Sequence, residues 1–343
     1  SPANNYAAAA RVWQDLATTQ LARSLWKPVW TQIGNAAFRL GEPHYDTAPE
    51  QTVQLWERSC EAYRIVLSES PRHKVAQPNL ALVEAKLARL KIRLADELVA
   101  KAQKQSLEPK IESLQAALDY YQAARELTPE DRQLPPKISQ TDRQLRGSLN
   151  ELAEKQEKQG DQSFAARSSW SDRQAEKQYQ EALSNFERAA FKDPETASPP
   201  AAPKPSSQDS SAQANPPAAK QAPDPTGDQP PSKNPEIQRA EQGGERVTDK
   251  LADLYARMGR QHQQEAGNQA KYSPERAVEN YHAALEDFGQ ALALEPEHTD
   301  AQRGEQEVKA ALEQLHMEQG RREMMAGMNQ LQRLRSCSAT SHP

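Results

Sequence analysis

The sequence is poor in several residue types that sheet proteins and disulfide-rich proteins depend on. Of its 343 residues, 13 are glycine, 2 are cysteine and 6% are aromatic. Few glycines and few runs of β-branched residues disfavour β-sheets, and two cysteines give no disulfide framework. A mean hydropathy of -0.94 is low for a compact sphere. These features favour an elongated stack of helices in which each layer buries a single face.

Long apolar runs and a concentrated charge of one sign are also missing. No stretch of 18 apolar residues occurs, so the sequence predicts no membrane span. The 43 basic and 48 acidic residues are interspersed and give a net charge of -5. Nucleic-acid binding requires a concentrated basic face, so we expect no nucleic-acid partner.

The motifs of common enzymes are absent as well. The seven histidines show no HExxH spacing, and there is no glycine-rich phosphate loop or G-x-S-x-G turn. Met and His side chains beyond Val308 could bind copper, but helix packing is the simpler account. We therefore predict a protein without catalytic activity, without a cofactor and without a metal site.

What the sequence does contain is an internal repeat that ends in proline. Four segments can be aligned by counting back from their prolines, which are Pro71, Pro129, Pro194 and Pro296. Eight residues earlier the side chain is always aromatic: Tyr63, Tyr121, Phe186 and Phe288. Fifteen earlier it is always large: Trp56, Leu114, Tyr179 and Tyr281. Twelve earlier it is always small: Ser59, Ala117, Ala182 and Ala284. Eleven earlier stand Cys60, Leu118, Leu183 and Leu285.

These spacings alternate between three and four residues and so place the positions on one face of a helix. A small residue lets a neighbouring helix approach, the aromatic ring one turn later fills the gap, and the proline ends the helix. We expect Trp56, Tyr63, Leu118, Tyr121, Tyr179, Phe186, Tyr281 and Phe288 to form the core of the repeat. Cys60 should be a small buried side chain, and a disulfide with Cys337 is not expected.

The small residue, the aromatic ring and the proline resemble the second helix of a tetratricopeptide (TPR) repeat. The family's first helix is resembled by the segment from Trp30 to Gly34 and by the segment from Leu251 to Tyr255. The spacing of 58 residues from Pro71 to Pro129 exceeds the family's period of about 34. We therefore predict units of roughly 60 residues with three helices each. This long form is similar to bacterial TPR proteins that accompany von Willebrand factor A domains and MoxR-type ATPases.

The predicted fold class is all-α, a TPR-like α-solenoid of two lobes joined by a disordered Pro-rich linker. Twelve prolines among the 42 residues from Pro194 to Pro235 support the linker. The domains predicted are a capping helix (1–29), three units (30–193), the linker (194–245), a fourth unit with a C-terminal helix (246–330) and a tail (331–343). The last unit would then be a separate lobe.

The resemblance implies a scaffold that holds a protein or peptide partner in a groove lined by first helices. The matching positions are Asn35 and Arg39 in the first unit and Asp253 and Arg257 in the last. The alternative for these four residues is ordinary solvated helix surface. The family's carboxylate clamp is matched by Asn35 alone, because Thr31 stands where a lysine is needed.

A second function class remains open, a self-assembling structural protein or an envelope-associated organiser. The C-terminal helix with its methionines would serve as the contact surface in the first case, whereas a docking scaffold should be monomeric. Four of the five tryptophans, Trp13 among them, lie in the first 56 residues, which we read as a packed cap rather than a membrane-surface helix. The chain opens on Ser1 and Pro2, as after a removed signal, an anchor or a truncation. We expect an exported or envelope location in bacteria rather than a cytoplasmic one.

Overall fold

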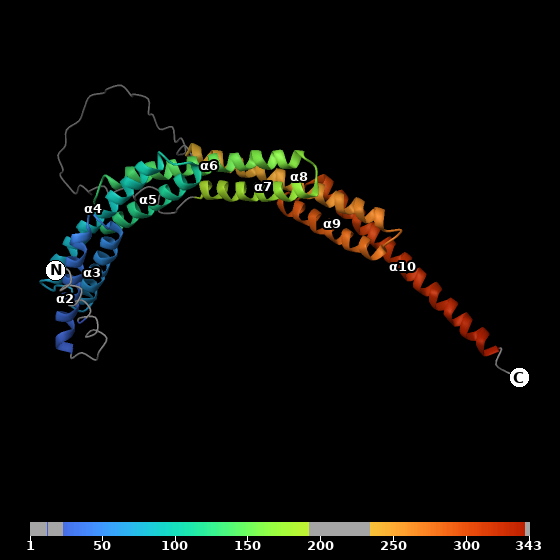
Figure 1. The fold of residues 1–343 in the computed structure, drawn as a ribbon, viewed down its shortest axis with the longest axis horizontal. Coiled ribbons are helices and arrows are strands. Elements are labelled where there is room, and N and C mark those ends of the chain that lie inside the picture. Colours follow the sequence, from blue (N-terminus) through green and yellow to red (C-terminus); the bar gives the residue numbers. More distant parts are fainter. Residues whose placement is uncertain (1–11, 13–22, 192–233, 340–343) are drawn as a thin grey trace, which may run out of the picture. The chain divides into compact units, whose positions relative to one another are not determined.

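The computed structural model describes residue 12 and residues 23–191 and 234–339, and over these ranges the chain is helical with no strand. The elements are α2 (Arg23–Gly41), η1 (Glu42–His44), α3 (Pro49–Glu69), α4 (Ala76–Ala102), α5 (Leu107–Leu127), α6 (Leu134–Ala165), α7 (Ser169–Ala190), α8 (Pro235–Gln269), α9 (Pro274–Leu294) and α10 (Thr299–Ala339) (Figure 1). The prediction of an all-α solenoid is confirmed. Two compact units divide the chain between Leu149 and Asn150, within α6.

Three of the four second helices, α3, α5 and α9, end in the same way. α3, α5 and α9 each have 21 residues, and a proline stands two positions after the last one. A residue before proline is forced out of the helical region. Accordingly, Ser70, Thr128 and Glu295 have φ of -140°, -137° and -134°. Their amide groups still donate to the carbonyl four residues back, so the helix closes cleanly before the chain turns.

The prediction of three helices per unit is wrong. A single helix, α4, lies between α3 and α5, and it packs on both. Val83, Leu87 and Leu90 of α4 are buried. α4 is thus the first helix of the next pair. The long period arises because the first helices are long, with 27 residues in α4, 32 in α6 and 35 in α8.

The predicted linker and the two-lobe division also need correction. α8 begins at Pro235, inside the range 194–245, and the Asn234 side chain accepts a hydrogen bond of 3.1 Å from the Glu236 amide at its start. Gly243 and Gly244 also fall in the predicted linker range, yet both lie in α8, where Gly243 packs against the Phe186 ring of α7. α8 therefore packs on α7 within one compact unit, and the last helices are no separate lobe.

α10 extends into the predicted tail, and parts of the predicted linker and cap lie outside the described residues. α10 continues to Ala339, so residues 331–339 are helical where a tail was predicted. Residues 192–233 lie outside the described residues, and so does most of the predicted cap at 1–29, including Trp13. Within the predicted linker and the predicted cap, the structure therefore describes only residues 234–245, residue 12 and residues 23–29.

The interior of each unit is built from rings of second helices set against glycines of first helices. A Cβ atom added to Gly34 of α2 would lie 2.6 Å from Cε1 of Tyr63, and one on Gly160 of α6 would lie 2.6 Å from Cε1 of Tyr179. The Phe288 ring meets Gly259 of α8 and Gly304 of α10 in the same way. The small positions of the repeat are fully buried: Ser59, Ala117, Ala182 and Ala284. The eight residues predicted as repeat core are buried too, between 0% and 7% exposed: Trp56, Tyr63, Leu118, Tyr121, Tyr179, Phe186, Tyr281 and Phe288.

Candidate interaction site

Asn35, one of the residues predicted to line a groove, lies among three helices and takes part in their packing. Its Oδ1 accepts a hydrogen bond of 2.7 Å from the Tyr63 hydroxyl of α3 and one of 3.1 Å from Nδ2 of Asn79 in α4. Burial raises the pKa of Tyr63, so the hydroxyl stays a donor. The structure thus assigns Asn35 to holding α2, α3 and α4 together.

The next pair of helices repeats this arrangement with charged groups. The Tyr121 hydroxyl of α5 donates to Asp96 of α4, and Nζ of Lys137 in α6 lies 2.7 Å from the same carboxylate oxygen. Polar residues on first helices therefore serve the stacking of one pair on the next. These polar groups are therefore engaged within the chain, on the helices where the family resemblance predicts partner binding.

Arg257 is likewise engaged inside its compact unit. Its guanidinium donates to Asp172 of α7 and, over 2.7 Å, to the Phe164 carbonyl, and it lies 3.6 Å from the centroid of the Phe164 ring. Asp253, the other predicted residue of α8, has an exposed carboxylate that lies 3.2 Å from Nε2 of His298. The two predicted pairs belong to different compact units, and Arg257 contributes to packing.

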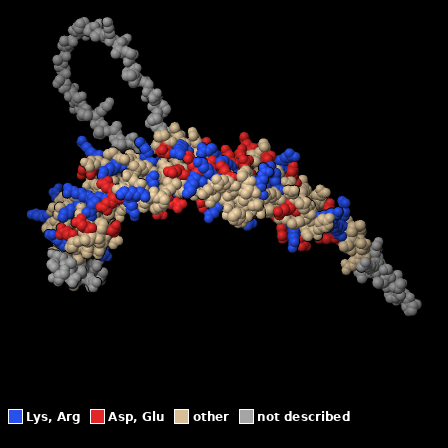
Figure 2. All heavy atoms as spheres, turned by 45° about the horizontal axis from the view of Figure 1, so that its top comes forward, with Lys and Arg blue, Asp and Glu red and all other residues tan. Residues whose placement is uncertain are grey.

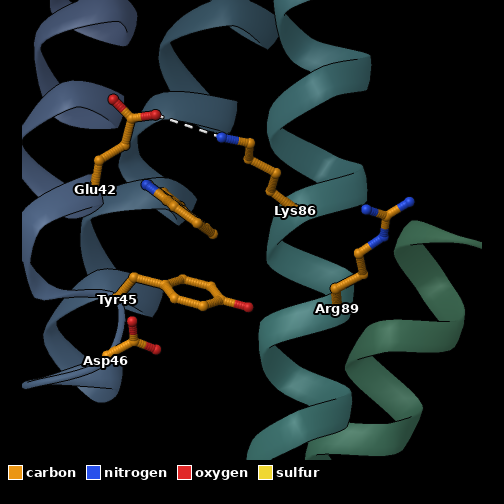
Figure 3. Close-up of a pocket in the computed structure, with 6 residues that line it drawn as sticks. Glu42, Tyr45, Asp46, Lys86 and Arg89 are labelled. Atoms are coloured by element: carbon orange, nitrogen blue, oxygen red, sulfur yellow. Dashed lines mark hydrogen bonds and ion pairs between the residues drawn. The ribbon is translucent and has the colours of Figure 1, made fainter.

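Arg39 remains on the surface at the edge of a pocket. Its Nη1 lies 2.8 Å from Oε2 of Glu42, with 57% of the arginine side chain exposed. Glu42 is one of the residues around a pocket of about 360 Å³ between the α2–α3 connection and α4 (Figure 3). The lining residues are Glu42, Tyr45, Asp46, Trp56, Lys86 and Arg89.

Aromatic rings form the base of this pocket. The Trp56 ring is 2% exposed and packs between Phe38 and Tyr45, with centroid distances of 5.5 and 5.7 Å. Its indole nitrogen donates a 3.1 Å hydrogen bond to the Phe38 carbonyl. A ring that is packed and hydrogen-bonded in this way cannot turn, so the base is rigid.

The two carboxylates at the pocket already have cationic partners. Glu42 lies 3.4 Å from Nζ of Lys86 as well as beside Arg39, and Asp46 lies 2.8 Å from Nη1 of Arg93. The Asp46 hydrogen bond raises the pKa of Arg93, so that guanidinium stays charged. The acids therefore offer little free negative charge to a ligand.

Two hydrogen-bond donors at the pocket have no acceptor within the described part of the chain. Arg89 of α4 is exposed and makes no hydrogen bond or ion pair there, and the Tyr45 hydroxyl makes no hydrogen bond. Figure 3 shows the hydroxyl directed from the α2–α3 connection toward the α4 wall that carries Arg89. The pocket can therefore supply donors to an incoming acceptor.

Sequence reasoning missed this pocket, because of its six lining residues it singled out only Trp56, as a core ring. One signal was available: Tyr45 is an aromatic residue in a short polar connection between two helices. Lys86 and Arg89 carried no signal, since exposed Lys and Arg occur throughout the helices.

The wider surface carries mixed charge. Figure 2 shows Lys and Arg side chains interspersed with Asp and Glu on the face in view. Within residues 23–191 and 234–339, no group of three His, Cys, Asp or Glu side chains is placed to hold a metal ion. None of the helices described is both long enough and apolar enough to cross a membrane.

Paired helices with buried small residues, rings against glycines and a proline after each second helix define a TPR-like helical repeat. No protein-family model and no curated protein matches the chain. Among solved structures, a TPR repeats protein from Bacteroides fragilis shares 12% identity over 81% of this chain and 98% of its own, with a TM-score of 0.21. A chain from the computational design of self-assembling cyclic protein homooligomers shares 10% identity over 92% of this chain and 95% of its own, also with a TM-score of 0.21. TM-scores this low add nothing to what the helix packing itself shows.

Proposed function

We propose that this chain is a non-catalytic helical-repeat protein that binds a protein partner at the pocket between the α2–α3 connection and α4. The observation that carries the proposal is a preformed pocket lined by two donors, Arg89 and the Tyr45 hydroxyl, that have no acceptor among the described residues. Unsatisfied donors on a rigid base are what a binding surface supplies to a ligand.

The composition of the pocket favours binding over catalysis. Its six lining residues include no histidine, cysteine or serine, and its carboxylates are engaged by Arg39, Lys86 and Arg93. A general base or nucleophile needs a free, activated group within reach of a substrate. None of the six lining groups meets that requirement.

Site-specific photo-crosslinking tests the proposal directly. A photoreactive phenylalanine derivative is placed at position 89 of the full chain and irradiated in an extract of the native organism, and adducts are identified by mass spectrometry. Position 72 is the matched control, because Arg72 is also exposed and unpaired but follows the opposite end of α3. We expect a defined partner to be captured at 89 and not at 72. Identical adducts at both positions, or none at 89, would overturn the proposal.

The narrower resemblance, to TPR proteins that accompany von Willebrand factor A domains and MoxR-type ATPases, stays a prediction. The same experiment bears on it, because it would identify the partner. Capture of a protein of either kind at position 89 would support that resemblance.

One observation supports self-assembly through α10 as a second candidate. Met317, Met324 and Met328 are 68%, 61% and 49% exposed. At about 100° per residue they lie on the side of α10 opposite Val308 and Leu312, which are buried. The methionine stripe therefore does not extend the face that packs on α8 and α9, and a second copy of the chain could cover it.

Light scattering over a concentration series decides between the two candidates. Self-assembly predicts a mass that rises with concentration in the full chain and stays at the monomer value in a variant with Met317→Gln and Met324→Gln. A docking protein predicts the monomer mass for both. If the two chains have the same mass at every concentration, self-assembly through α10 is excluded.

A further inference from the structure

We infer that the pocket between the α2–α3 connection and α4 takes an acidic peptide segment whose carboxylates accept from Arg89 and from the Tyr45 hydroxyl. This inference rests on the proposed function and names the class of partner. It is argued from the charges, the rigidity and the size of the pocket.

The charges around the pocket leave one cation uncompensated. Glu42 is shared by Arg39 and Lys86, and Asp46 is paired with Arg93. Arg93 also lies 3.8 Å from Glu97, so each of these three acids has a cation next to it. Arg89 is left without an acid, and a carboxylate ligand would supply one. A guanidinium binds a carboxylate with two parallel hydrogen bonds or shares it with a neighbouring donor.

The Tyr45 hydroxyl is a second donor to such a segment, and its ring is held on two sides. The ring lies 4.3 Å from the guanidinium carbon of Arg93 and 5.7 Å from the Trp56 ring. Nη2 of Arg93 also donates to the Tyr45 carbonyl over 2.5 Å. The hydroxyl therefore keeps its direction toward α4, as Figure 3 shows, and little conformational entropy is lost when it binds.

The size of the pocket fits side chains of a peptide. Its volume of about 360 Å³ is near the lower end of the roughly 300–1,000 Å³ that is usual for ligand pockets. It opens to solvent between a connection and a helix, so a peptide backbone can pass outside while an Asp or Glu side chain enters. Lys and Arg side chains are interspersed with Asp and Glu on the face that Figure 2 shows, which disfavours a polyanion such as nucleic acid, because it needs an extended basic face.

The test measures fluorescence anisotropy of a short labelled Glu-rich peptide titrated with the full chain. The control peptide has the same length with Gln in place of Glu. We expect binding of the Glu peptide only, and weaker binding at high salt because an exposed ion pair is screened. Arg89→Ala should weaken binding roughly five- to tenfold and Tyr45→Phe roughly threefold. Arg72→Ala, at the far end of α3, should leave the affinity unchanged.

Each outcome has a separate meaning. Arg89 contacts no other described residue through a hydrogen bond or ion pair, so Arg89→Ala should keep the wild-type melting temperature. Equal loss of affinity in the Arg89 and Arg72 variants, or no binding of the Glu peptide, would overturn the inference. Photo-crosslinking at position 89 that still captures a partner would then leave the proposed function standing with another occupant. Binding of a single-stranded oligonucleotide as tight as that of the Glu peptide would overturn the peptide assignment.

Discussion

Arg257 of α8 forms a buried ion pair with Asp172 of α7, where the aspartate side chain is 1% exposed and the arginine side chain 17%. Beside it, the Tyr255 hydroxyl donates a 2.8 Å hydrogen bond to Glu176. These contacts join helices that are separated in sequence by residues 192–233. A buried ion pair is costly to break from one side, because it leaves a charge without compensation.

Cleavage of the chain within residues 192–233 should therefore leave one particle. A protease site is engineered into that range, and the cut chain is run on size exclusion beside the uncut chain. We expect both fragments to co-elute, since the α7–α8 interface holds them. Asp172→Ala should promote separation of the fragments, because it leaves Arg257 unpaired. Fragments that separate in the wild type would restore the view of two independent lobes.

Asn35 and Arg39 should differ sharply when each is replaced by alanine. Asn35→Ala removes the acceptor of Tyr63 and Asn79 and should lower the free energy of unfolding by about 1–3 kcal/mol. Arg39→Ala removes an exposed ion pair with Glu42 and should cost no more than about 1 kcal/mol. Urea denaturation of the two variants checks this. A larger loss in the Arg39 variant would mean that these hydrogen bonds contribute little.

Glycine-to-alanine substitutions at two helical positions should change the free energy of unfolding in opposite directions. In Gly34→Ala the new methyl group would meet the Tyr63 ring at 2.6 Å, and the rearrangement should cost about 1–3 kcal/mol. Gly289→Ala in α9 would add a methyl group in open space and should stabilise by about 0.5–1 kcal/mol. Thermal unfolding of both variants measures the difference. A neutral or stabilising Gly34→Ala would contradict the packing of ring on glycine.

Cys60 should resist thiol reagents until the chain unfolds. The residue is 1% exposed, and burial raises the pKa of its thiol to about 12, so at pH 8 the unreactive protonated form predominates. The experiment uses a Cys337→Ser chain, so that one thiol is followed by absorbance after addition of an aromatic disulfide. We expect slow labelling in buffer and fast labelling in urea. Fast labelling of the native chain would falsify the burial of this position.

The sequence predicted the second helices well because their constraints are local. A proline follows each helix, and alternating steps of three and four residues define its buried face, so four copies could be aligned without a structure. The first helices were harder. Their partners are rings elsewhere in the chain, and nothing around Gly243 and Gly244 indicates that Phe186 lies against them. A polar stretch with two glycines was therefore read as a linker although it is helical.

The pocket could not be predicted for a related reason. It exists because Tyr45 in a connection faces Lys86 and Arg89, which lie some forty positions later in the sequence. Arg39 and Asn35 lie one turn apart and looked equivalent, yet Asn35 meets Tyr63 and Asn79 whereas Arg39 reaches solvent beside Glu42. Only the packing of the next helix separates the two roles.

The long connection between α7 and α8 occurs where the other pairs turn within the short spans Ser70–Val75 and Thr128–Gln133. The helices on both sides pack directly on each other, so their contact does not depend on a short connection between them. We expect a reporter domain spliced into residues 192–233 to leave the contact of Phe186 with Gly243 and the ion pair of Arg257 in place. This range is thus a position at which a second domain can be attached to the helical repeat.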